Sequence, residues 1–159
     1  MSKVEIETTD RRILEALQAD GRLTIVELAD RVGLSPSPCL RRVRHLERDG
    51  YIEGYRAALN RSRIGLGLTV FVGIKLDGHA DERAAGLQTA IRDMPEVVSC
   101  YIVSGEADYL LEVVVPDLAH YEQFLMGSLL KNPLIKDVRS SFAIRMVKAS
   151  APLSLGHLP

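Results

Sequence analysis

The stretch from Thr24 to Gly50 constrains the fold of this 159-residue chain most strongly, because it encodes two short helices and a tight turn between them. Thr24, followed three residues later by Glu27, is the signature of a capping box that begins a helix. Gly33 can adopt the left-handed conformation that a sharp turn requires. Ser35 is a suitable N-cap for the second helix, which Gly50 can end.

Both predicted helices have one apolar face. In the first helix this face consists of Val26 (or Ile25), Leu28, Ala29 and Val32, and in the second it consists of Leu40, Val43 and Leu46. The second helix carries four arginines mostly on its other faces: Arg41, Arg42, Arg44 and Arg48. A helix over residues 8–20 completes a three-helix head. This pattern predicts a helix-turn-helix that places the 36–49 helix in the major groove of DNA.

The distribution of charge favours the same interpretation, although the whole chain has a formal net charge of only −1. Residues 31–63 hold eight Arg/Lys against three Asp/Glu, whereas residues 64–159 hold eight against eleven. A basic head joined to an acidic second domain is typical of a protein that binds nucleic acid through one part. Only 5% of the residues are aromatic and none is Trp, which disfavours stacking on single-stranded bases.

The second half of the chain alternates between strand and helix patterns. Strands are expected at 68–76, 97–104, 109–115 and 136–147, and helices at 81–92 and 117–130. This β-α-β-β-α-β order predicts a ferredoxin-like domain and an α+β fold for the chain. We expect a helix-turn-helix domain at 1–52, a linker with a short strand at 53–67, the ferredoxin-like domain at 68–149 and a tail at 150–159.

One face of the predicted sheet has no helix to cover it. That face carries Phe71, Tyr101 and Val103 or their neighbours. An uncovered apolar sheet face predicts that the chain associates with copies of itself.

Two segments resemble the Lrp/AsnC (feast/famine) family of transcriptional regulators. One is Val-Gly-Leu-Ser-Pro-Ser-Pro-Cys-Leu-Arg-Arg-Val (32–43), and the other is Cys-Tyr-Ile-Val-Ser-Gly-Glu-Ala-Asp-Tyr-Leu-Leu (100–111). The resemblance is closest to the leucine-responsive branch. It implies an amino-acid effector, with leucine, methionine or a similar apolar one preferred, bound between protomers by the second domain. It also implies double-stranded DNA as a partner, a homodimer that assembles further, with an octamer expected, and a cytoplasmic, nucleoid-associated protein.

The 36–49 helix supplies the candidate DNA contacts. Ser35 and the amides at the helix start suit a phosphate, because the helix dipole favours an anion there. Ser37, Pro38 and Arg41 are candidates for base edges, and arginine can bind guanine with two hydrogen bonds. Arg42, Arg44 and Arg48 are assigned to the DNA backbone. The alternative is a solvated helix face, with Arg48 in a surface ion pair with Glu47 or Asp49.

The loop between the second and third strands supplies the candidate effector site. Ser104 and Gly105 offer exposed amides to a carboxylate, Asp108 offers a partner for an ammonium group, and Glu106 is a further candidate. Apolar neighbours that suit the effector side chain are Ile102, Leu118 and Leu130, with Ser141 or Phe142 contributed by another protomer. The alternative is a plain β-turn in which Asp108 bonds its own backbone.

The sequence offers little support for other functions. No nucleophile–base pair, metal-ligand cluster or phosphate-binding glycine loop is evident, so we expect neither an enzyme nor a cofactor or metal. Cys39 and Cys100 are far apart and are expected to pack as small apolar residues. No apolar run is long enough for a membrane helix. The remaining alternative is an architectural DNA-binding protein that takes no ligand.

Overall fold

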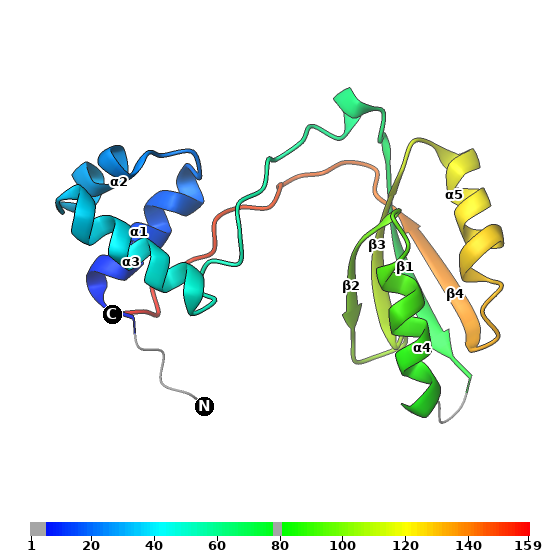
Figure 1. The fold of residues 1–159 in the computed structure, drawn as a ribbon. Coiled ribbons are helices and arrows are strands. Elements are labelled where there is room, and N and C mark those ends of the chain that lie inside the picture. The colour runs from blue at the N-terminus through cyan, green and yellow to red at the C-terminus, as the bar shows by residue number, and fades with distance from the viewer. Residues whose placement is uncertain (1–5, 78–80) are drawn as a thin grey trace. The chain divides into compact units, whose positions relative to one another are not determined.

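The computed structural model describes residues 6–77 and 81–159, which form two separate units (Figure 1). Of the described residues, one unit combines 6–58 with 148–159, and the other contains 59–77 and 81–147. The first unit is the predicted head and contains α1 (Thr8–Ala19), α2 (Ile25–Val32) and α3 (Pro36–Arg48). The C-terminal segment, for which the sequence offers no pattern, groups with this head.

The predicted helix-turn-helix is confirmed, and the signals at both ends of α2 act as expected. Thr24 Oγ1 accepts a hydrogen bond from the Glu27 amide at 3.3 Å, and Glu27 Oε2 accepts one from the Thr24 amide at 2.8 Å. Gly33 ends α2 with φ 73°. Ser35 stands at the N-cap position of α3, but its side chain makes no capping hydrogen bond.

The core of the head forms where the three helices meet. Its fully buried side chains are Ile13, Leu28, Cys39 and Leu46, joined by Ala29, Val32 and Val43. Ile25 packs against this core, whereas Val26 is exposed. Of the two residues considered for the apolar face of α2, Ile25 is therefore the one that faces the core. This core fixes which face α3 presents to solvent.

The second unit confirms the ferredoxin-like fold. Its elements are β1 (Leu68–Leu76), α4 (Asp81–Arg92), β2 (Val97–Ile102), β3 (Tyr109–Val115), α5 (Leu118–Phe124), a π-helical turn (Leu125–Leu129) and β4 (Ile135–Phe142). The strands pair antiparallel in the order β2-β3-β1-β4. Both helices pack on one face of the sheet, against a core that includes Val70, Val72, Ile74, Leu111 and Val113.

The sheet leaves aromatic side chains on its other face. Phe71 lies opposite Glu112, and Tyr101 lies opposite Leu110, so the two aromatics share a face because residues two apart on β3 point the same way. Phe71 is 41% exposed and Tyr101 is 59% exposed. Val103, the third residue predicted on this face, lies beyond the end of β2 and is half-buried.

Two predicted strand ends and one predicted strand are wrong, because a strand extends only as far as it has a pairing partner. β4 stops at Phe142 rather than at 147, since Phe142 pairs with Val70 near the start of β1 and only one backbone bond, from Ala143 to Thr69, follows. β2 ends at Ile102 rather than at 104. The short strand expected within 53–67 is absent; that stretch contains only a 3-10 turn, Ser62–Ile64.

The capping box provides a test of the head's stability. We expect Thr24→Ala to lower the free energy of unfolding by about 1 kcal/mol, because it leaves an amide at the start of α2 without its partner. Chemical denaturation followed by circular dichroism measures the change. Thr8→Ala, at the exposed start of α1, is the control. An equal effect of both substitutions would contradict the role of the capping box.

Candidate DNA-binding surface and effector loop

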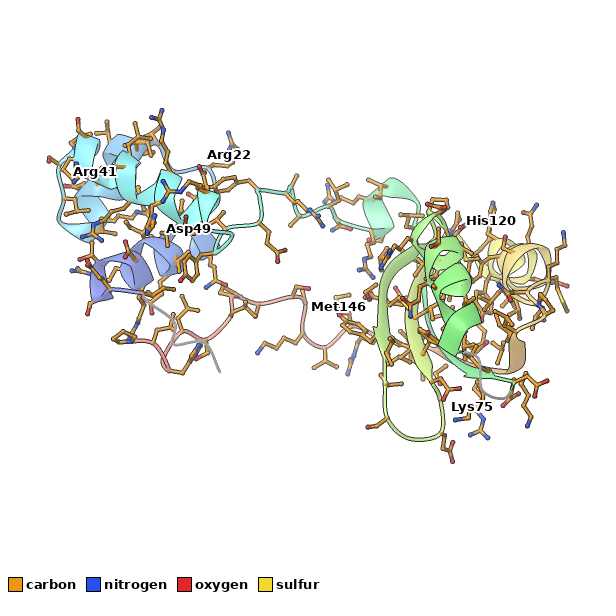
Figure 2. All side chains as sticks on the ribbon, turned by 60° about the horizontal axis from the view of Figure 1, so that its bottom comes forward. Arg22, Arg41, Asp49, Lys75, His120 and Met146 are labelled. Atoms are coloured by element: carbon orange, nitrogen blue, oxygen red, sulfur yellow. The ribbon has the colours of Figure 1, made fainter. Side chains whose placement is uncertain are left out.

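Helix α3 presents two arginines that no other group engages. Arg41 and Arg44 are exposed, and neither side chain has a hydrogen bond or ion pair within the described ranges 6–77 and 81–159; Figure 2 marks Arg41 on the head. Ser35 and Ser37 are exposed near the start of the helix, and Pro38 is half-buried. The N-terminal part of α3 therefore offers exposed hydroxyl and guanidinium groups, which a helix needs in order to contact base edges in the major groove.

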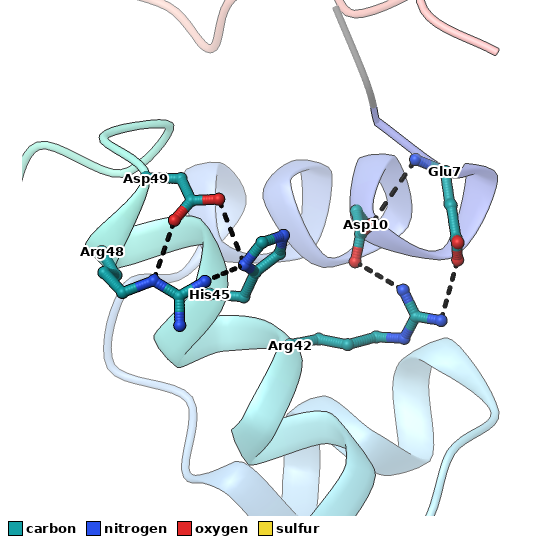
Figure 3. A network of polar contacts seen from close by, with 6 residues as sticks. All are labelled: Glu7, Asp10, Arg42, His45, Arg48 and Asp49. Atoms are coloured by element: carbon teal, nitrogen blue, oxygen red, sulfur yellow. Dashed lines mark hydrogen bonds and ion pairs between the residues drawn. The ribbon is translucent and has the colours of Figure 1, made fainter.

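Arg42 instead ties α3 to the start of α1 (Figure 3). Its Nη2 lies 2.8 Å from Glu7 Oε2, and its Nη1 lies 3.0 Å from Asp10 Oδ1. The Asp10 side chain is only 8% exposed, so this carboxylate needs a cationic partner. The bonds to Asp10 and Glu7 raise the pKa of Arg42 above its ordinary value. This geometry assigns Arg42 to the packing of the head and leaves its predicted contact with the DNA backbone without support.

Arg48 forms the surface ion pair that was the alternative to a DNA contact. Its Nε lies 3.0 Å from Asp49 Oδ1, and Asp49 Oδ2 lies 3.1 Å from His45 Nδ1 (Figure 3). The Arg48 side chain is largely exposed, so the pair contributes little to stability. Arg42 and Arg48 thus each pair with an acidic side chain of the head, whereas Arg41 and Arg44 have no such partner among the described residues.

The loop between β2 and β3 is closed by backbone bonds at its ends and open in its middle. The Val103 amide donates to the Asp108 carbonyl at 3.0 Å, and the Asp108 amide donates to the Ile74 carbonyl at 2.8 Å. Within the described part of the chain, the amides of residues 104–107 donate to no backbone carbonyl. Gly105 has φ 117°, a conformation that favours glycine. Successive unpaired amides of this kind can bind an anion.

Asp108 anchors this loop to β1. Its Oδ1 accepts from Lys75 Nζ at 2.8 Å, and its Oδ2 accepts from the Leu76 amide at 2.8 Å. The backbone bond from Leu76 and the Lys75 ammonium hold the pKa of Asp108 below its usual value. Asp108 thus bonds the backbone of a neighbouring strand rather than its own turn, which differs from the alternative that the sequence suggests.

Two residues of β1 that support the loop are not evident from sequence reasoning. Lys75 pairs with Asp108, and Gly73 lies beneath the loop, where a Cβ would come within 3.3 Å of the Ala107 Cβ. The available signal is a lysine and a glycine in a largely apolar strand. Glu106, on the exposed loop tip, forms an ion pair with Arg139 of β4.

The predicted apolar lining of the effector site is split between the two ends of the sheet. Ile102 adjoins the loop, and Leu130 lies five residues before Ile135, which pairs with Leu76 at the loop end. Leu118 follows β3 at its far end, where Ser141 and Phe142 also lie opposite Phe71 and Val70. At about 3.4 Å per residue, the length of β3 separates these ends by roughly 20 Å.

Two side chains of this unit, Leu118 and Cys100, are exposed. Leu118, a candidate for the effector lining, is 62% exposed. The buried face of α5, which begins at Leu118, is formed by Tyr121 and Phe124. Cys100, expected to pack as a small apolar residue, is exposed on the edge strand β2, whereas Cys39 is buried as expected.

A cavity of about 570 Å³ lies beside the loop, between α4 and β2. Ile102 and Tyr109, which flank the loop on either side, are among its lining residues, together with Ile91 and Val97. Gln88 Nε2 donates to the Tyr109 hydroxyl at 3.0 Å within this lining. A cavity with both polar and apolar lining residues therefore lies at the strand ends that flank the loop.

The described residues contain neither a metal-ligand cluster nor a membrane-spanning helix. Across residues 6–77 and 81–159, no three His, Cys, Asp or Glu side chains gather closely enough to hold a metal ion. No helix in the same ranges has the length and apolarity needed to cross a membrane.

A helix-turn-helix head joined to a ferredoxin-like domain defines a DNA-binding regulator with a ligand-binding module, and comparisons with known proteins agree. Residues 6–53 match the model of a winged helix-turn-helix DNA-binding domain, and residues 69–153 match that of the Lrp/AsnC ligand binding domain. The chain belongs to the Lrp/AsnC family of transcriptional regulators, as its sequence predicts.

Individual relatives are similar over nearly their whole length. The leucine-responsive regulatory protein of Escherichia coli (strain K12) is 44% identical over 146 residues, which cover 92% of this chain and 89% of that protein. A transcriptional regulator of Neisseria meningitidis, solved as a complex with L-Met, is 40% identical with a TM-score of 0.91, covering 97% and 99% of the two chains. An AsnC family regulator of Agrobacterium tumefaciens is 39% identical, also with a TM-score of 0.91, covering 97% and 100%.

The pairing of Arg42 with Asp10 makes a prediction that separates stability from DNA binding. We expect Arg42→Ala to lower the free energy of unfolding by about 1–2 kcal/mol, because it leaves the buried Asp10 carboxylate without its cation. Arg44→Ala, which removes an exposed arginine from the same helix, should leave stability unchanged. Thermal denaturation of both variants gives the comparison, and an unchanged melting temperature for Arg42→Ala would contradict the assignment.

Proposed function

We propose that this regulator binds a medium-sized apolar amino acid, leucine or methionine preferred, between the protomers of a homo-oligomer, and that the ligand alters its assembly or its DNA binding. The observation that carries the proposal is the loop at 103–108, in which unpaired backbone amides lie beside the Asp108 carboxylate. Two relatives agree with this choice of ligand: the leucine-responsive regulatory protein of Escherichia coli and the regulator of Neisseria meningitidis solved as a complex with L-Met.

The chemistry of the loop suits the two charged groups of a free amino acid. The amides of residues 104–107 are donors for a carboxylate. Asp108 uses two hydrogen bonds for Lys75 and Leu76, and a carboxylate can accept about four. Its side chain is 36% exposed, so an ammonium group can reach the remaining positions and form a charge-assisted bond.

The ligand's side chain needs residues from two protomers. Ile102 is at the loop end of the sheet and is one of the apolar residues that line the cavity there. Leu118, Ser141 and Phe142 lie at the far end of the same sheet. A second protomer that brings its own far end to this loop completes the lining. We therefore assign these three residues to the partner's share of the site.

Exposed apolar surface supports self-association. Phe71 and Tyr101 lie on the sheet face that no helix covers. We propose a homodimer through this face, which assembles into a higher oligomer, an octamer by family resemblance. An effector that binds one arrangement of protomers more tightly shifts the equilibrium toward it, and thereby changes how several heads meet DNA.

On DNA, we propose that α3 enters the major groove. Ser37, Pro38 and Arg41 contact base edges, while Ser35, the neighbouring amides and Arg44 contact phosphates. This division rests on the exposure of Arg41 and Arg44 and on their lack of hydrogen-bond or ion-pair partners among the described residues.

A second candidate, an architectural DNA-binding protein without a ligand, is favoured by one observation. The Lys75–Asp108 pair satisfies the loop's carboxylate from within the chain. Screening the twenty amino acids by thermal shift separates the two candidates. A site filled at 100 times its dissociation constant stabilises the protein by roughly 2.7 kcal/mol, whereas a ligand-free protein shows a flat screen.

The role of Asp108 is tested by Asp108→Asn. Asparagine keeps an oxygen for the Leu76 amide but loses the negative charge, so we expect a folded protein whose thermal shift with L-Leu or L-Met is lost. The control is Asp93→Asn, an exposed aspartate at the end of α4. A full response of Asp108→Asn would remove this residue from the ligand site.

The two arginines of α3 are predicted to act differently. Arg41→Ala should weaken binding to the preferred sequence by about 1–3 kcal/mol and relax specificity, because a base contact is lost. Arg44→Ala should weaken binding to all sequences and reduce the slope of log K against log salt by about one. Competition between specific and random duplexes at several salt concentrations distinguishes them; identical behaviour would contradict the assignment.

A further inference from the structure

The C-terminal segment, residues 148–159, is bound to helix α1 of the head. The side-chain amide of Gln18 forms two hydrogen bonds with the backbone of Leu153. Gln18 Nε2 donates to the Leu153 carbonyl at 3.2 Å, and Gln18 Oε1 accepts from the Leu153 amide at 2.7 Å. A glutamine that satisfies both backbone groups of one residue replaces the bonds that a neighbouring strand would supply.

A second anchor lies near the end of the chain. The Leu158 carbonyl accepts from Arg11 Nη1 at 3.0 Å, and the Leu158 amide closes a turn by donating to the Leu155 carbonyl at 3.0 Å. The Leu158 side chain is only 8% exposed. Burial of this leucine offsets part of the conformational entropy lost when the segment is ordered.

The two anchors match the geometry of a helix. Arg11 and Gln18 are seven residues apart, which places them on one face of α1 at a separation of about 10 Å. The segment runs in the opposite direction to α1, with Leu153 at Gln18 and Leu158 at Arg11. Figure 1 shows it returning to the start of α1. None of these contacts uses Arg41 or Arg44 of α3.

We propose that α1 is a docking surface for the chain's own C-terminal segment, which acts as a strap on the DNA-binding head. The head then has two connections to the ligand-binding domain: the covalent stretch before β1, and the stretch after β4, which reaches the head through the non-covalently docked strap. Two connections restrict the head's orientation more than one does. The part of this proposal that concerns transmission of the ligand signal rests on the proposed function above.

Hydrogen exchange measured on the full-length protein tests the docking. In the wild type, the peptide covering residues 150–159 should contain protected amides at Leu153 and Leu158. Gln18→Leu should speed exchange in this peptide about fivefold, the equivalent of a net hydrogen bond of about 1 kcal/mol. Gln123→Leu, at an exposed glutamine of α5, is the control and should change nothing. Exchange of the wild-type peptide at the rate of an unstructured chain would overturn the proposal.

Two leucines of the strap allow a matched test of its function. Leu158→Asp should release the strap because its side chain is buried, whereas Leu153→Asp should not, because that side chain is 75% exposed. We expect both variants to bind a single DNA site within twofold of the wild type. Leu158→Asp alone should reduce the effect of L-Leu or L-Met on multi-site DNA binding at least threefold.

The outcomes separate the two proposals. If the wild type responds to the amino acid and Leu158→Asp responds equally, the strap does not transmit the signal. If the wild type shows no response to any amino acid, the proposed ligand function fails, while hydrogen exchange still decides whether the strap is docked.

Discussion

The pairing of β1 with β3 is the interaction on which the ligand-binding domain depends. Their register, from Leu68 opposite Val115 to Ile74 opposite Tyr109, places alternate side chains of both strands in one core beneath α4 and α5. The same pairing fixes the loop, because Asp108 stands immediately before β3 and bonds Leu76 at the end of β1. A shift of one residue would reverse both faces and move the loop away from its anchor.

Within the head, packing and the proposed DNA recognition are divided among neighbouring arginines. Arg42 pairs with the buried carboxylate of Asp10, and Arg48 pairs with Asp49, whereas Arg41 and Arg44 have no partner among the described residues. Consecutive positions on one helix can therefore serve stability and DNA binding separately, since successive side chains point about 100° apart. A cluster of basic residues on a recognition helix is not a uniform DNA-binding surface.

Local signals account for what the sequence predicts correctly. The Thr24–Glu27 capping box, Gly33 and the apolar steps Val43 and Leu46 act within a few residues, so their pattern defines the helix-turn-helix. The end of β4, the Lys75 partner of Asp108, the Asp10 partner of Arg42 and the docking of Leu158 depend on residues far away in the chain. Such partners have no signature in spacing or composition. The absence of a linker strand has the same cause, since an extended segment becomes a strand only when another strand pairs with it.

The most direct test of the account is to measure DNA binding by fluorescence anisotropy in the presence and absence of L-Leu and L-Met, with L-Asp as the comparison. Coupling between ligand and DNA sites typically amounts to about 1–3 kcal/mol. The account predicts that at least one of the two apolar amino acids shifts the apparent dissociation constant for multi-site DNA by about fivefold or more, while L-Asp does not. Superimposable curves under all conditions would contradict it.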